Sequence, residues 1–218
     1  MIHRLDSTRR KAVSILLCGL PAIAPAWLGG CSGSLLPKAP PLPTLHALSL
    51  DDAEAPPARP PAAGARVLTV LAPRAAAGFD SPNLVYLRRP HEHEAFAQNA
   101  WVDTPARMLA PMLVRALQRS GAFRAVLSAQ GSAMAELALD TEIIRLQQDF
   151  GQQPSQVRFT LRAVLIDSAT RRVLAWREFD RRVPALSDDP RAGVAAANQA
   201  ARQVLDELVA FCDASLAA

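Results

Sequence analysis

Residues 156–183 read QVRFTLRAVLIDSATRRVLAWREFDRRV, and this stretch decides the fold. From Val157 to Leu165 every second residue is apolar, a period of two that is typical of a strand with one buried face. The polar link at 167–172 is short, and residues 173–183 follow as a second strand. Two strands joined by so short a turn are expected to pair antiparallel.

Segments on the N-terminal side extend this sheet. Residues 136–149 are expected to form a long strand, with the side chains from Leu137 to Ile143 alternating between two faces. Together with the two strands that follow, it would make an antiparallel meander. Shorter strands are predicted at 67–73, 83–89 and 122–127, and residues 45–50 could add an edge strand.

Two helices are predicted to cover this sheet. The first begins at Thr104-Pro105 and ends at Ser120-Gly121, with Pro111 either kinking it or marking where its regular part begins. The second begins after Asp188-Asp189-Pro190. We expect structural roles for the residues of their apolar stripes and for the tryptophan before the first helix: Trp101, Leu109, Leu113, Leu117, Leu205 and Leu208. The predicted class is α+β, a largely antiparallel sheet with both helices packed on one face.

Residues 1–30 have the features of a bacterial lipoprotein signal peptide. A basic start is followed by an uncharged apolar run, which ends in Leu28, Gly29, Gly30 and Cys31. This is the lipobox pattern, in which two small residues precede the cysteine whose thiol takes the diacylglycerol. The alternatives are an uncleaved anchor, or an ordinary secretory signal followed by a chance cysteine.

The predicted mature protein would begin at Cys31 and carry acyl chains, which anchor stably when there are two or more. Ser32 follows the cysteine, where Asp would favour retention at the inner membrane. We therefore expect a lipid-anchored protein of the outer membrane that faces the periplasm. Residues 31–64 are expected to form a proline-rich tether, and residues 65–213 the globular domain.

Charge and cysteine content exclude other classes. The formal net charge is +4, but residues 1–30 hold four basic and one acidic side chain, so the mature chain is close to neutral. Nothing therefore indicates nucleic-acid binding. Of three cysteines only Cys212 would remain free after processing and lipidation, which leaves no intramolecular disulfide and favours a packed thiol.

One cluster could carry chemistry. Residues 91–94 read HEHE, and His91 and His93 are weak candidates for metal ligands, because a closed site needs about four ligands. The competing interpretation, which we favour, is a solvated polar connector between the strand that stops at Pro90 and the helix at Thr104. No nucleotide-binding, hydrolase or zinc motif is present, so we predict no enzyme activity and no cofactor.

Several segments in order resemble one family. They are NLVYLR (83–88), PARMLAPMLVRALQRSGAF (105–123), VLIDSATRRVLAWREFD (164–180) and VPALSDDPRAGVAAANQAARQVLDEL (183–208), after the lipobox and the early run LHALSL (45–50). The chain resembles the ABC-type transport auxiliary lipoproteins, the PqiC-like group that accompanies Mce-type lipid transport systems. The family usually has a tyrosine in the early run, which is absent here.

The resemblance implies a non-catalytic docking component whose partners are an Mce-domain protein and an ABC permease with its ATPase. The cargo would be phospholipid or another hydrophobic molecule, and the chain could form a homo-oligomer. The alternative is an envelope lipoprotein that regulates cell-wall synthesis or secretion, with a domain similar to the TolB N-terminal and curli-secretion type. A metal-dependent enzyme that uses HEHE is a third hypothesis.

Overall fold

Three long strands form the meander that the alternation of apolar residues predicts. In the computed structural model, β8 (Gln156–Asp167) pairs antiparallel with both β7 (Leu137–Asp149) and β9 (Val173–Pro184). The structure describes residues 41–50, 58–129 and 134–217. The predicted signal peptide, the lipobox and Cys31 lie outside the described residues.

Six shorter strands complete one mixed sheet: β1 (Thr44–His46), β2 (Val67–Val70), β3 (Arg74–Ala75), β4 (Asn83–Leu87), β5 (His93–Trp101) and β6 (Ala125–Ser128). The long pairs are antiparallel, as is β4 with β5. The parallel pairs, such as β1 with β5 and β2 with β6, span only a few residues each. The sheet is thus largely antiparallel by length, which confirms the predicted class.

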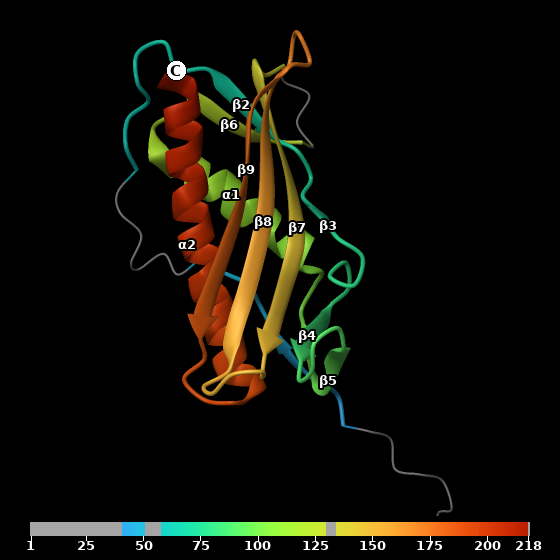
Figure 1. The fold of residues 1–218 in the computed structure, drawn as a ribbon. Helices are drawn as coiled ribbons and strands as arrows, with labels where there is room; N and C mark the ends of the chain where they lie inside the picture. The colour runs from blue at the N-terminus through green and yellow to red at the C-terminus, as the bar shows by residue number, and fades with distance from the viewer. Residues whose placement is uncertain (1–40, 51–57, 130–133, 218) are drawn as a thin grey trace, which may run out of the picture. The chain divides into compact units, whose positions relative to one another are not determined.

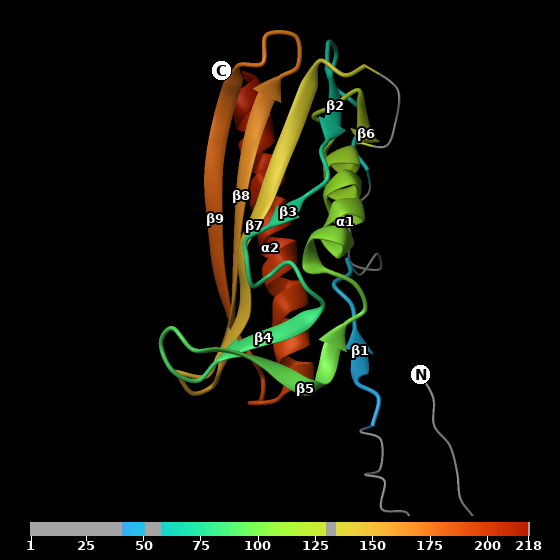
Figure 2. The same ribbon diagram turned by 90° about the vertical axis from the view of Figure 1, so that its right-hand side faces the viewer.

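Both helices lie on the same side of the long strands (Figures 1 and 2). The helix α1 (Pro105–Ser120) contains Pro111 within its length and ends at Gly121, whose φ of 77° suits a residue without a Cβ. The helix α2 (Pro190–Ala217) begins after Asp189, whose carboxylate accepts a hydrogen bond from the Ala192 N–H. Among the described residues, no helix is long and apolar enough to cross a membrane.

The core lies between the sheet and the two helices. Its side chains come from the inner faces of the long strands, such as Phe159 and Leu161, and from the predicted stripes of both helices. The helix residues Leu109, Leu113, Leu117, Leu205 and Leu208 are all buried there. Trp101 is also buried, with 3% of its surface exposed.

The segment after Pro90 differs from the predicted polar connector. The chain turns back at His91, whose φ is 69°, and residues His93–Trp101 return beside β4 as strand β5. The physical reason is strand pairing on both sides: β5 pairs with the preceding strand β4 on one side and with the distant β1 on the other. The early edge strand is also shorter than residues 45–50, since β1 covers Thr44–His46 and Leu48 already packs in the core.

Candidate partner-binding surface

The side of the long strands that faces away from the helices is called here the outer face. It is turned toward the viewer in Figure 1, and neither of the two described helices packs on it. The registers of β7 with β8 and of β8 with β9 place its side chains in rows that run across three strands. The rows nearest the β8–β9 turn are apolar, and those farther along are ionic.

The ionic rows are held by pairs of opposite charge. Arg162 of β8 lies between Glu142 of β7, at 3.3 Å, and Glu178 of β9, at 3.4 Å. In the next rows Arg158 makes a two-pronged contact with Asp180, in which its Nε lies 2.8 Å from Oδ1 and its Nη2 lies 2.9 Å from Oδ2.

These contacts change the proton affinities of the Arg158–Asp180 pair. The hydrogen bonds from Arg158, with a further one from the Thr160 hydroxyl, lower the pKa of Asp180. The same carboxylate raises the pKa of Arg158. Both groups are therefore charged at neutral pH, and Arg158 and Asp180 neutralise each other on the outer face.

The apolar rows form what we call the apolar patch, which consists of Val164, Ile166, Val173, Leu174 and Trp176. Trp176 lies opposite Val164, and Val173 lies opposite Ile166. The Trp176 ring is 66% exposed and Val173 is 56% exposed, which is unusual for large apolar side chains gathered at one place. Tryptophan is enriched among the residues that dominate protein–protein binding energy.

Strand β9 also forms an edge of the sheet. Within the described part of the chain it pairs with β8 alone, so the backbone groups along its other side are not used by the sheet. An edge of this length can pair with another chain unless charged side chains guard it.

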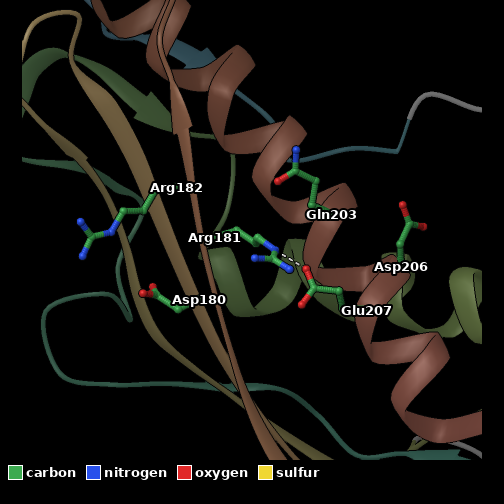
Figure 3. Close-up of a pocket in the computed structure, with 6 residues that line it drawn as sticks. All are labelled: Asp180, Arg181, Arg182, Gln203, Asp206 and Glu207. Carbon is green, nitrogen blue, oxygen red and sulfur yellow. Dashed lines mark hydrogen bonds and ion pairs between the residues drawn. The ribbon is translucent and has the colours of Figure 1, made fainter. Parts of the chain in front are cut away.

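A shallow recess of about 640 Å³ runs between β9 and α2. Figure 3 shows Arg181 reaching across it to Glu207 of α2, with which it forms an ion pair, while Asp180 and Arg182 project from the other side of the strand. Burial raises the pKa of Asp206 on the same helix. The recess is lined by charges of both signs, and Arg181 closes part of the β9 edge.

The histidine pair does not gather further ligands. His91 lies in the turn after β4, and His93 begins β5 with its ring against Phe79 at 5.8 Å between centroids. Across residues 41–50, 58–129 and 134–217, no group of three or more His, Cys, Asp or Glu side chains could hold a metal ion. The geometry therefore gives no support to the metal-enzyme hypothesis.

The sequence predicts a strand at residues 173–183, but the exposed position of Trp176 was not among the predictions. The available signal was the alternation, since Phe179 and Val183 face the core, and Trp176 must then point to the opposite face. The structural residues predicted from the helix stripes all lie in the core, away from the apolar patch.

One family model matches most of this chain, and solved structures share its fold. The sequence model of the family described as the ABC-type transport auxiliary lipoprotein component matches residues 48–209. A crystal structure of a protein from Xanthomonas campestris is 28% identical, with a TM-score of 0.66, and the match covers 79% of this chain and 96% of that one. A second crystal structure, of an uncharacterized protein, has a TM-score of 0.62 at 13% identity and covers 78% and 99% of the two chains. None of the curated proteins compared matches this chain.

Proposed function

The chain belongs to the family of ABC-type transport auxiliary lipoprotein components, and from that membership we propose that it is the outer-membrane docking component of an Mce-type transport system. In this proposal Cys31 carries the acyl chains, and the domain faces the periplasm. The cargo is phospholipid or another hydrophobic molecule. The partners are an Mce-domain protein and an ABC permease with its ATPase.

The observation that carries the docking role is the apolar patch on the outer face. An exposed tryptophan beside Val164 and Val173 offers a partner a rigid aromatic anchor with an apolar surround. The ion pairs of Arg162 and Arg158 next to it would form a polar rim. The chain has no nucleotide-binding motif, so the ATPase of the system must be another chain.

The edge of β9 supports a second kind of contact in the same assembly. A further copy of this chain could pair along it, which would give the homo-oligomer that the sequence suggested. The ion pair between Arg181 and Glu207 would then have to shift, because it crosses the space beside that edge.

Affinity isolation from detergent-solubilised envelopes tests the docking role. The native chain is compared with Trp176→Ser and with the control Ala210→Ser, which alters an exposed position on α2. We expect the Mce-domain protein and the permease with its ATPase to copurify with the native and control chains, and to be lost with Trp176→Ser. Recovery of cell-wall synthesis or secretion components in their place would support the alternative function and contradict this one.

A further inference from the structure

Several connections gather at one end of the domain, which we call the lower end because it is lowest in Figures 1 and 2. They are the β4–β5 turn (88–92), the β7–β8 loop (150–155), the β9–α2 loop (185–189) and the strand β1. Backbone hydrogen bonds join them, from the Ala185 N–H to the Ser155 carbonyl and from the Phe150 N–H to the Leu87 carbonyl. The lower end is thus a continuous surface rather than separate loops.

The described chain also enters the domain at this end. Strand β1 begins at Thr44, and the residues just after it contact α2 close to its start, where the Asn198 side chain bonds to Ala47 and Ser49. Figure 2 shows β1 rising from the lower end. Whatever holds the N-terminal part of the chain therefore pulls on this end of the domain.

Three leucine side chains at the lower end are exposed. Leu186 in the β9–α2 loop is 97% exposed, Leu42 is 93% exposed, and Leu45 is more than half exposed. None of the three contributes to the core. Isolated exposed leucines are common on protein surfaces. Several exposed leucines at one end of a domain instead indicate a surface that contacts another molecule or a membrane.

The carboxylates of the β9–α2 loop accept hydrogen bonds from neighbouring groups. The Asp188 carboxylate accepts a hydrogen bond from the Ser155 N–H at 2.8 Å. The Asp189 carboxylate accepts from the Ala192 N–H and the Ser187 hydroxyl. The acidic groups of the loop are thereby engaged with backbone and hydroxyl donors. Leu186, which precedes them in the loop, is left exposed.

The neighbouring connections add two arginines and an uncharged loop. Arg88 and Arg89 follow β4 at the same end, with the Arg88 guanidinium over the Tyr86 ring at 5.2 Å and Arg89 in an exposed pair with Glu92. Residues 150–155 read FGQQPS and carry no charge. Exposed leucines beside arginines are the composition by which peripheral proteins engage a lipid surface.

We propose that the lower end rests on a lipid bilayer, with Leu186, Leu42 and Leu45 in its interfacial layer and Arg88 and Arg89 at the headgroups. The inference rests on the proposed anchor at Cys31. Leu42 is the eleventh residue after Cys31, so even a fully extended link reaches at most about 40 Å. The lower end is therefore the part of the domain that the link holds nearest the membrane.

This placement has a consequence for the apolar patch. The β8–β9 turn lies at the opposite end of the long strands (Figure 1). A strand as long as β8 spans roughly 40 Å at about 3.3 Å per residue, so Trp176 would be held well away from the bilayer. The patch would then face the periplasm, where a partner that crosses the envelope can reach it.

Fluorescence quenching by lipids tests this orientation. An environment-sensitive NBD label is placed at Leu186→Cys, or at the control Val173→Cys near the opposite end, in the mature chain on phosphatidylethanolamine–phosphatidylglycerol vesicles that contain doxyl-labelled lipid. Buried Cys212 does not compete for the label. We expect a blue-shifted emission and loss of fluorescence with doxyl lipid at position 186, and neither effect at position 173.

A second attachment separates this inference from the anchor itself. The same labelled chains carry an N-terminal hexahistidine tag in place of Cys31 and are bound to vesicles that contain nickel-chelating lipid. Failure of the native chain to float with vesicles would contradict the lipidation of Cys31 but not the proposed orientation of the domain. Absence of quenching at position 186 on the tagged, vesicle-bound chain would overturn the proposed orientation, and would leave the lower end for a second copy or another protein.

Discussion

Trp176 of β9 lies directly opposite Val164 of β8 on the side of the sheet that faces away from α1 and α2. The pair joins a largely exposed aromatic ring to a half-buried aliphatic side chain, and an ionic row of Glu142, Arg162 and Glu178 follows immediately. The charges of the ionic row are already paired within the chain, so the apolar rows are the part of this face that gains most from a partner.

Replacing the buried Trp101 with Ala should destabilise the domain. The ring is 3% exposed and packs in the main core, so the free energy of unfolding should fall by about 3–5 kcal/mol. Urea unfolding followed by circular dichroism measures the loss. Trp176→Ala is the matched control, because an exposed ring should cost only about 0.5 kcal/mol. Equal losses in the two variants would contradict the assigned burial.

Asp180→Asn should change how stability depends on pH. Arg158 lowers the pKa of Asp180, so the ionised carboxylate stabilises the fold above its unfolded pKa of about 3.9, and this contribution is lost as the pH falls through the lower folded pKa. The pair is partly exposed, so the effect should stay within about 1 kcal/mol.

Urea unfolding at pH 7 and at pH 3 compares the native chain with the Asp180→Asn variant. The native chain should be the more stable at pH 7, and the difference should shrink at pH 3. A difference that stays constant between the two pH values would show that the carboxylate is not held by Arg158 in solution.

Cys212 should be unreactive in the folded chain. Burial raises the pKa of its thiol to about 12, so the nucleophilic thiolate is scarce at pH 8 and the sulfur is inaccessible. In a chain with Cys31 replaced by Ser, maleimide should label Cys212 only after unfolding in urea. Rapid labelling without denaturant would contradict the buried position.

Cys31→Ala should release the protein from membranes. Without its acyl chains the chain keeps no described segment able to span a bilayer, so it should move from the membrane to the soluble envelope fraction. Metabolic labelling with palmitate and immunoblots of the fractions measure the change. Unaltered membrane attachment would favour an uncleaved N-terminal anchor.

The sequence predicts the meander and both helices because their residues repeat with a regular period. Val157 to Leu165 alternate on a strand, and Leu109, Leu113 and Leu117 follow one helix face, so local pattern and burial agree. The helix cap at Asp189 can also be predicted from the local sequence, because an acidic residue before a proline is a common helix start.

Strand β5 could not be predicted in the same way. Its residues HEAFAQNAW have no continuous apolar face, and they form a strand because β4 and β1 lie on either side. The turn at His91 lacks the Asn-Gly or Asp-Gly signal of a tight hairpin. The position of Trp176 could have been derived from the alternation of β9, but its pairing with Val164 depends on a register that the bulge at Leu165 shifts.

Site-specific photo-crosslinking from position 176 in intact envelopes tests the docking role most directly. A photoreactive benzoylphenylalanine replaces Trp176 in one strain and the exposed Ala210 on α2 in another. Our account predicts a crosslink from position 176 to the Mce-domain protein of the transport system, and no such product from position 210. Crosslinks from position 176 to cell-wall synthesis components, or none at all while position 210 reacts, would contradict it.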